Sequence, residues 1–241
     1  MNYGTLYGVG VGPGDPELIT LKAVKILRHV AVVFAAASTR NHYSLAVEIA
    51  SPHLDRGVPV AHLGFPMTRD KKVLADAWAE NSRKVVETLK DGNDAAFITL
   101  GDPLIYSTFG YILEAVRKAH PEIPIKIIPG ITSYQAGAAA TGQILVEGEG
   151  SFAVTTGIGG GGSLKQWVDH ADSVVMLKVY RHYKEILDTL NELDLTDNSV
   201  LVSRCGMDGE EIVWNLKDRD DTPPHYMSHL IIRKKRWISS P

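Results

Sequence analysis

Residues 97–106 read Phe97-Ile98-Thr99-Leu100-Gly101-Asp102-Pro103-Leu104-Ile105-Tyr106, an apolar run followed by a tight loop. The run begins at Ala95 and has turn-forming residues on both sides, which predicts a buried strand. Gly101 allows a backbone or a ligand to approach closely, and Pro103 cannot continue the hydrogen bonds of a strand. In open α/β sheets the ligand lies beyond the carboxyl ends of the strands. The stretch therefore predicts either a ligand-binding loop or an ordinary strand-to-helix turn.

The composition excludes several classes of function. The chain has 241 residues, 44% of them hydrophobic and 22% charged, which allows one large domain or two of medium size. A net charge of −3 gives no basic field for nucleic acid, and the one cysteine, Cys205, excludes an internal disulfide. No apolar run reaches membrane-spanning length, and the N-terminus lacks the features of a signal peptide. We expect a cytoplasmic protein that binds neither nucleic acid nor a membrane.

Short apolar runs alternate with helical patterns over the first part of the chain, and this alternation predicts parallel strands. The helical patterns place apolar residues at intervals of three and four. The expected strands are residues 5–11, 30–37, 58–63, 95–100 and 125–128, and the expected helices are residues 18–27, 43–50, 70–90, 109–119 and 132–141.

After Gly142 the strands become more frequent and the helices shorter, which indicates a mixed sheet. The glycine run 157–162 is interpreted as a mobile surface loop, because no Lys-Ser/Thr pair follows it as in a phosphate-binding loop. We expect two α/β domains, residues 1–130 with a mostly parallel sheet and residues 131–241 with a mixed sheet, and a ligand in the cleft between them. The expected strands of the second domain are residues 152–155, 173–180, 199–205, 210–216 and 230–233, and its expected helix is 182–193.

The first loop is rich in glycine but does not fit a dinucleotide-binding loop. The third glycine of that motif would fall on Pro13 or on Asp15, depending on where the count starts. The acidic residue expected about 20 positions later is missing as well. Asp15 instead suits a helix N-cap, with Pro16 at the first helical position. These features disfavour a nicotinamide-dependent oxidoreductase, and the absence of Gly-Lys-Ser/Thr excludes a P-loop.

Three motifs stand in order, each at the end of an expected strand. Together they resemble the tetrapyrrole methyltransferase family, which uses S-adenosylmethionine on a two-domain α/β fold. Further stretches extend the likeness over essentially the whole chain and are similar to the precorrin-2 C20-methyltransferases of that family. The three motifs are Gly10-Val11-Gly12-Pro13-Gly14-Asp15-Pro16, Gly101-Asp102-Pro103-Leu104 and Pro129-Gly130-Ile131-Thr132-Ser133. The further stretches are residues 65–70, 100–109, 204–207 and 230–234.

The resemblance implies methyl transfer from S-adenosylmethionine to C20 of precorrin-2, or of its cobalt-bound counterpart cobalt-factor II, in cobalamin biosynthesis. It also implies a small-molecule tetrapyrrole substrate and a homodimer. Alternatives within the family are methylation of another ring carbon and a diphthine synthase-like activity on a protein. An alternative of a different class is a non-catalytic module that binds S-adenosylmethionine and has no affinity for tetrapyrroles.

The cofactor site of the family carries over position by position in the first domain. Pro13 is implied to line the first loop, and Gly101 and Asp102 to hold the amino-acid end of the cofactor. By charge, Asp102 suits the ammonium group, and Ile105 is implied to pack beside it. Taken alone, Pro13 and Gly101 would also be explained as residues that shape turns.

Thr132 and Ser133 are implied to hydrogen-bond the cofactor, although residues of these types also cap helices. Near the adenine the resemblance places Leu177, Cys205 and Gly206, the last two as a small-residue site that offers backbone groups. Without the family motifs, Leu177 would be read as core, and Cys205 as a small buried hydrophobe.

The many carboxylates of a tetrapyrrole substrate require cationic partners, and Arg offers them a bidentate fork. The candidates are Arg40, Arg69, Arg181 and Arg204. Arg40 and Arg69 are preferred because both lie in expected loops after strands, although most surface arginines are only solvated. The nine histidines show no metal-ligand spacing, so no metal is expected except cobalt within the substrate. No catalytic base is identified. Some relatives carry an Asp at the end of the second strand, where this sequence has Ala35 and Ala36.

Overall fold

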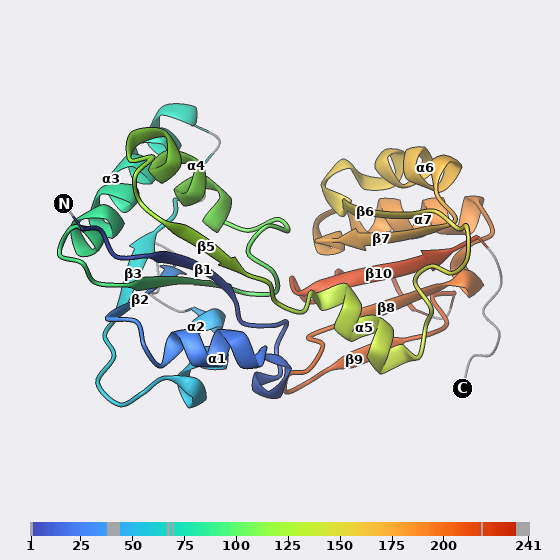
Figure 1. Cartoon of the computed structure of the whole chain (residues 1–241). Coiled ribbons are helices and arrows are strands. Elements are labelled where there is room, and N and C mark those ends of the chain that lie inside the picture. The colour runs from blue at the N-terminus through green and yellow to red at the C-terminus, as the bar shows by residue number, and fades with distance from the viewer. Residues whose placement is uncertain (1, 38–43, 67, 69, 218, 235–241) are drawn as a thin grey trace. The chain divides into compact units, whose positions relative to one another are not determined.

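The computed structural model describes residues 2–37, 44–66, 68, 70–217 and 219–234. The chain divides into two compact units, Met1–Thr132 and Ser133–Pro241, here called unit 1 and unit 2 and described one at a time. Each unit combines a sheet with helices (Figure 1). Within the described ranges, no helix is both long and apolar enough to cross a membrane.

Unit 1 is built on a sheet of order β3-β2-β4-β1-β5, in which each described pairing is parallel (Figure 1). Parallel strands point the same way, so their carboxyl ends share one edge of the sheet. The loops that follow β4, β1 and β5 are therefore neighbours at that edge. The strands are β1 (Leu6–Gly10), β2 (Val32–Ala37), β3 (Val60–Gly64), β4 (Ala95–Thr99) and β5 (Ile125–Ile128).

Two apolar cores hold the helices of unit 1 on the two faces of this sheet. Helices α1 and α2 pack around Val9 and Ile98, and helices α3 and α4 pack on the opposite face around Phe97. The alternation of side chains along each strand supplies both cores, because successive residues point to opposite faces. The helices are α1 (Leu21–Leu27), α2 (Leu45–Ala50), α3 (Lys71–Lys90) and α4 (Phe109–Ala119), with short 3-10 turns η1 (Pro16–Leu18) and η2 (Ser51–His53).

The start of α1 shows how local sequence divides one expected helix into two pieces. The Asp15 carboxylate accepts the Glu17 N–H at 2.8 Å and caps the short turn η1, as expected for this N-cap. The Thr20 hydroxyl then accepts the Ala23 N–H at 3.2 Å and caps α1. The helix expected from residue 18 therefore begins at Leu21, because Thr20 adopts an extended conformation between the two pieces.

Unit 2 has a mixed sheet of order β6-β7-β10-β8-β9 (Figure 1). The β6–β7 pairing is parallel, and β10 pairs antiparallel with both β7 and β8. Helices α6 and α7 pack on one face around Met176 and Leu230. The strands are β6 (Phe152–Thr156), β7 (Ser173–Leu177), β8 (Ser199–Ser203), β9 (Glu211–Val213) and β10 (Ser228–Arg233). The helices are α5 (Ser133–Thr141), α6 (Gly160–His170) and α7 (Tyr183–Glu192), with 3-10 turns η3 (Gly157–Gly159), η4 (Val179–His182) and η5 (Thr196–Asn198).

The interpretation of residues 157–162 as a mobile surface loop is wrong. These residues form η3 and the first turn of α6, and Gly160 and Gly161 are buried. A Cβ on Gly161 would lie 2.1 Å from the Thr189 hydroxyl oxygen of α7. The glycines therefore allow two helices to pack closely, a use of glycine that depends on tertiary contact and has no local signature.

Three strands of unit 2 end earlier than expected, and one of them is the strand expected over 210–216, which ends at Val213. The strand expected over 173–180 ends at Leu177, and the one expected over 199–205 ends at Ser203. Lys178 has a φ of 57° and Arg204 has a φ of 52°, and the left-handed region is incompatible with a strand. The apolar patterns therefore continue past the point where the backbone turns.

Candidate active site

Three loops meet at the carboxyl edge of the unit 1 sheet. The Gly101 N–H donates to the Gly12 carbonyl at 2.7 Å, which joins the loop after β4 to the loop after β1. A Cβ on Gly10 would lie 2.4 Å from the Gly101 carbonyl oxygen, and a Cβ on Gly130 would lie 2.1 Å from the same oxygen. We call Gly10, Gly101 and Gly130 the glycine junction. Contact requires glycine at Gly10 and Gly130, and a φ of 68° favours it at Gly101.

The Asp102 carboxylate ties the loop after β4 to the loop after β5. One carboxylate oxygen accepts the Leu104 N–H at 2.8 Å, and the other accepts the Gly130 N–H at 3.1 Å. A carboxylate has about four lone-pair sites, so two such bonds leave acceptor capacity for a ligand. Asp102 therefore has a structural role, which is compatible with the predicted role of binding an ammonium group.

The other predicted residues of unit 1 lie in the same set of loops. Pro13 is buried in the loop after β1, and Thr132 is buried in the loop after β5. Ile105 is 41% exposed, between two apolar side chains that are also exposed. Ser133 is the first residue of α5 and belongs to unit 2. The structure thus brings Pro13, Gly101, Asp102 and Thr132 to one edge of one sheet.

In unit 2 the predicted residues follow two strands that run in the same direction. Leu177 ends β7, and Cys205 and Gly206 follow β8. Burial, and secondarily the Glu210 carboxylate, raises the pKa of the Cys205 thiol to about 12, so this side chain is a neutral thiol. The Gly206 N–H donates to Glu210 Oε2 at 2.7 Å, so this backbone donor is engaged within its own loop.

Left-handed backbone conformations occur beside predicted site residues in both units. In the described part of the chain, the non-glycine residues with a positive φ are Tyr106, Lys178, Asp194 and Arg204. All of them except Asp194 are sequence neighbours of Ile105, Leu177 or Cys205. Such conformations cost energy for residues with a side chain and cluster at functional sites. This coincidence does not depend on the motifs and supports the same positions.

Buried polar atoms without a hydrogen-bond partner are distributed in a similar way. Among the residues described, these atoms are Thr99 Oγ1, Tyr183 Oη, Ser203 Oγ and His229 Nε2. Thr99 ends β4 and Ser203 ends β8, each two positions before a predicted residue. Neither hydroxyl was identified from the sequence, where each reads as one more residue of an apolar strand.

His229 was also missed, and its environment explains why. It lies opposite Leu177 in the antiparallel register of β10 and β7, and burial lowers the pKa of its imidazole to about 4. A Cβ on Gly137 of α5 would lie 2.4 Å from His229 Nε2, so the ring packs against this helix. The small residues of α5 were the available signal for a close contact, but they do not indicate its partner.

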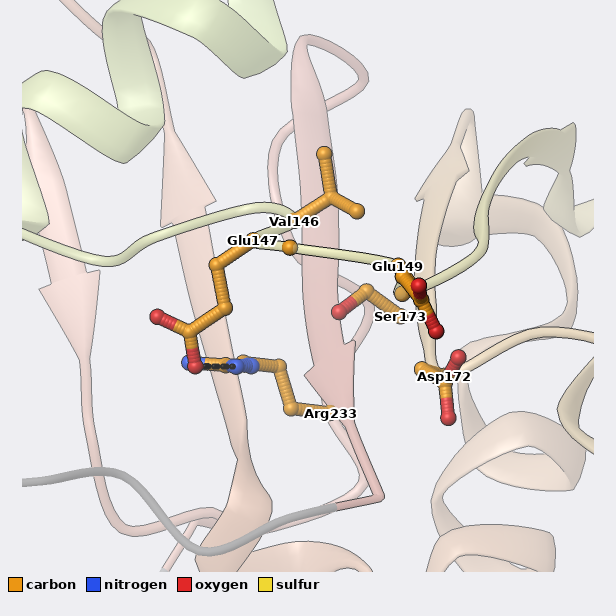
Figure 2. Close-up of a pocket in the computed structure, with 8 residues that line it drawn as sticks. Val146, Glu147, Glu149, Asp172, Ser173 and Arg233 are labelled. Carbon is orange, nitrogen blue, oxygen red and sulfur yellow. Dashed lines mark hydrogen bonds and ion pairs between the residues drawn. The ribbon is translucent and has the colours of Figure 1, made fainter.

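A cavity of about 400 Å³ lies at the opposite edge of the unit 2 sheet (Figure 2). Its lining includes Glu147, Glu149, Asp172 and Arg233, and Figure 2 shows Glu147 directed at Arg233, 3.4 Å away. Arg233 ends β10, so the cavity is at the end of the sheet away from Leu177. Three carboxylates beside one guanidinium disfavour a ligand that is itself rich in carboxylates.

The two arginines predicted to bind substrate, Arg40 and Arg69, lie outside the described residues. Within the described ranges, no three side chains of His, Cys, Asp or Glu are grouped as a metal site would require.

Comparisons with known proteins indicate one family. The family profile described as Tetrapyrrole (Corrin/Porphyrin) Methylases matches residues 5–219. The chain is 34% identical over 233 residues to a protein of Methanocaldococcus jannaschii named "Probable cobalt-precorrin-2 C(20)-methyltransferase", covering 95% of this chain and 96% of that relative. It is 30% identical over 239 residues to the "Precorrin-2 C(20)-methyltransferase" of a Sinorhizobium species, covering 95% of each chain.

A solved structure extends the likeness to the fold. The uroporphyrin-III C-methyltransferase of Thermus thermophilus, in a complex with S-adenosylhomocysteine, has a TM-score of 0.66 at 22% identity. The match covers 96% of this chain and 98% of that one.

Proposed function

The chain belongs to the tetrapyrrole (corrin/porphyrin) methylase family, and on that premise we propose that it methylates C20 of precorrin-2 or of its cobalt-bound counterpart in cobalamin biosynthesis. The observation that carries this proposal is the likeness over the full length of both chains to C20-methyltransferases. One of those relatives is named for a cobalt-containing substrate and the other for a metal-free one, so the proposal includes both substrates.

The residues of unit 1 suit the proposed methyl donor, S-adenosylmethionine. When bound, this molecule supplies an electrophilic methyl group on a cationic sulfur. The backbones at the glycine junction are free of side chains, and Asp102 retains acceptor capacity for an ammonium group. Gly101 and Asp102 are proposed to hold the amino-acid end, with Ile105 beside them. Pro13 is proposed to line the first loop, and Thr132 to hydrogen-bond the cofactor. Ser133 is proposed to donate or accept one further hydrogen bond.

The residues of unit 2 are proposed to bind the adenine. Leu177 offers an apolar side chain, and Cys205 and Gly206 offer a small-residue segment. The neutral thiol of Cys205 suits this passive role, since a thiol with a pKa of about 12 is not a nucleophile near neutral pH. The Gly206 N–H would have to leave Glu210 in order to bind adenine, so we expect its neighbours to make the stronger contacts.

Alignment of the reactants is the main catalytic contribution that we propose for these residues. Methyl transfer neutralises the positive charge on the sulfur, so this charge is dispersed in the transition state. A site that excludes water therefore does not disfavour the reaction. The C20 carbon of a reduced tetrapyrrole is enamine-like and already nucleophilic, and the proton that it carries leaves after the methyl group has been added. Holding donor and acceptor in line therefore supplies much of the rate. Arg40 and Arg69 are proposed to bind the carboxylates of the substrate.

The alternatives make different predictions for one experiment. The protein is incubated without oxygen with S-adenosylmethionine and either precorrin-2 or cobalt-factor II, and the products are analysed by mass spectrometry and by NMR with a ¹³C-labelled methyl group. We expect one added methyl, at C20. Methylation at another ring carbon would replace the proposal with a different member of the family. Binding of the donor with no methyl transfer to either substrate would favour the non-catalytic module.

A homodimer is part of the same proposal. The family resemblance is its basis, and light scattering coupled to size-exclusion chromatography tests it. A mass near twice the 26.3 kDa of one chain is the expected result, and a mass near that of one chain contradicts it.

A further inference from the structure

Thr99 has a buried hydroxyl that lacks a hydrogen-bond partner. The residue is 6% exposed, and its Oγ1 is among the few buried polar side-chain atoms in the described residues with no partner. Unpaired buried hydroxyls lower the stability of a folded protein. A valine would have nearly the same shape without that penalty. The chain thus carries a polar atom where folding alone favours an apolar one.

The position of Thr99 relates this hydroxyl to the candidate site. Thr99 is the last residue of β4 and lies beside Gly10, the last residue of β1, in the parallel register. The loop that contains Gly101 and Asp102 begins directly after it. Its carbonyl accepts the Val11 N–H at 3.0 Å, so the backbone of Thr99 is held between the two strand ends.

Asp102, the polar side chain nearest to Thr99 in the loop that follows β4, is not a hydrogen-bond partner of the Thr99 hydroxyl. The Asp102 carboxylate accepts backbone N–H groups from Leu104 and Gly130, and it makes no hydrogen bond with the Thr99 hydroxyl. The other Thr99 neighbours on its face of β4 are apolar, because Ala95 and Phe97 alternate with it along the strand and lie in the core under α3 and α4. The described protein atoms therefore offer no hydrogen-bond partner for the Thr99 hydroxyl.

We propose that the Thr99 hydroxyl donates a hydrogen bond to a carboxylate of a bound ligand. This inference rests on the proposed function, in which both ligands carry carboxylates. One source is the amino-acid end of S-adenosylmethionine, and the other is an acid side chain of the tetrapyrrole. In the first case Asp102 and Thr99 divide the two charges of the amino-acid end between them, Asp102 taking the ammonium group and Thr99 the carboxylate.

Three variants test the proposal. Thr99→Val removes the hydroxyl and keeps the shape, and Thr99→Ser keeps the hydroxyl. Thr189→Val is the matched control, because the Thr189 hydroxyl donates to the Glu185 carbonyl at 2.8 Å and lies in α7 of unit 2. Each variant is measured for melting temperature without ligand, for affinity by calorimetry, and for the KM of the tetrapyrrole. The calorimetric probes are S-adenosylhomocysteine and 5′-methylthioadenosine, which lacks the amino-acid end.

Thr99→Val is expected to melt at or above the wild-type temperature without ligand, since it loses no internal bond. If the carboxylate is that of the methyl donor, the affinity of Thr99→Val for S-adenosylhomocysteine falls about tenfold, while the affinity of this variant for 5′-methylthioadenosine does not change. If the carboxylate belongs to the tetrapyrrole, the KM rises by a similar factor and both calorimetric affinities are kept. Thr99→Ser retains the wild-type values, and Thr189→Val melts lower with unchanged affinities.

Two results overturn the inference alone. One is a clear loss of melting temperature in Thr99→Val, which would reveal an internal partner. The other is normal binding and KM in Thr99→Val while the wild type methylates its substrate. Failure of the wild-type protein to bind S-adenosylhomocysteine or a tetrapyrrole overturns the proposed function, and the inference with it.

Discussion

Predicted site residues adjoin left-handed residues in both units, but those of unit 1 meet through glycine backbones, whereas those of unit 2 lie beside a buried histidine. In unit 1 the contact at the glycine junction leaves no room for a side chain at Gly10 or Gly130. In unit 2 the corresponding turns are made by Lys178 and Arg204, which have ordinary side chains. A site formed by close backbones restricts residue type at each position, while a site formed by tertiary packing does not.

The largest expected effect comes from a substitution that disrupts the glycine junction. Gly130→Ala places a Cβ against the Gly101 carbonyl and the Gly10 backbone, and neither atom belongs to a flexible side chain. We expect the free energy of unfolding to fall by about 3 kcal/mol or more, measured by urea denaturation. Gly110→Ala is the matched control in the same unit, because its Cβ would meet nothing within 4 Å in α4. It should raise stability by about 0.5–1 kcal/mol, and an equal loss in both variants would contradict the contact argument.

The next effect concerns His229 in unit 2. Burial lowers the pKa of this histidine to about 4, and an unfolded histidine has a pKa near 6.5. Between these values the unfolded state binds more protons, so stability falls as the pH is lowered from about 6.5 towards 4. The expected loss attributable to His229 is about 3 kcal/mol when the change is complete.

His229→Leu isolates that contribution, because the other histidines titrate in both proteins. The difference in unfolding free energy between wild type and variant should change steeply between pH 6.5 and 4 and be flat above pH 7. The same pH dependence in both proteins would show that His229 is protonated or solvated in the native state.

Substitutions of Asp102 are expected to have a smaller effect, and they distinguish its contribution to stability from its contribution to ligand binding. Asp102→Ala removes the acceptor of two backbone N–H groups, so we expect a loss of about 1–2 kcal/mol of stability as well as weaker binding of S-adenosylhomocysteine. Asp102→Asn keeps one acceptor oxygen but loses the charge. It should lose less stability than Asp102→Ala and a comparable amount of affinity. Affinity unchanged in Asp102→Asn would leave Asp102 with its structural role only.

The smallest expected effect concerns Cys205 in unit 2, which we expect not to react with an alkylating reagent in the native protein. Cys205 is buried, and its thiol has a pKa of about 12, so iodoacetamide at pH 8 should not label the native protein. Complete labelling after unfolding in guanidinium is the control. Rapid native labelling, read by mass spectrometry, would show that the loop after β8 exposes the sulfur.

The sequence predicted the structure correctly where the residue pattern of a segment was enough to determine its conformation. The strand at 125–128 and the helix at 109–119 have the expected bounds, and β4 differs from expectation by one residue. The motifs around Gly101 and Gly130 could be read because a missing side chain is visible in a sequence. In these cases the requirement at a position is a property of that position alone.

Other features depend on partners that are distant in sequence. The helix α6 was missed because glycines seldom begin helices, and only the contact with Thr189 of α7 explains Gly161. Thr99 and His229 have no local signal, because their significance lies in a missing partner and in a neighbouring helix. The structural role of Asp102 likewise required the position of the loop after β5.

The central claim is that the ligand binds at the carboxyl edge of the unit 1 sheet, and hydrogen–deuterium exchange with S-adenosylhomocysteine tests it most directly. The ligand should slow the exchange of amides in peptides that cover residues 99–109 and 128–134. Peptides that cover residues 144–151, of which residues 146–150 line the cavity of unit 2, should exchange at an unchanged rate. Protection confined to residues 144–151 and 171–174, with none around Gly101 and Gly130, would contradict the claim.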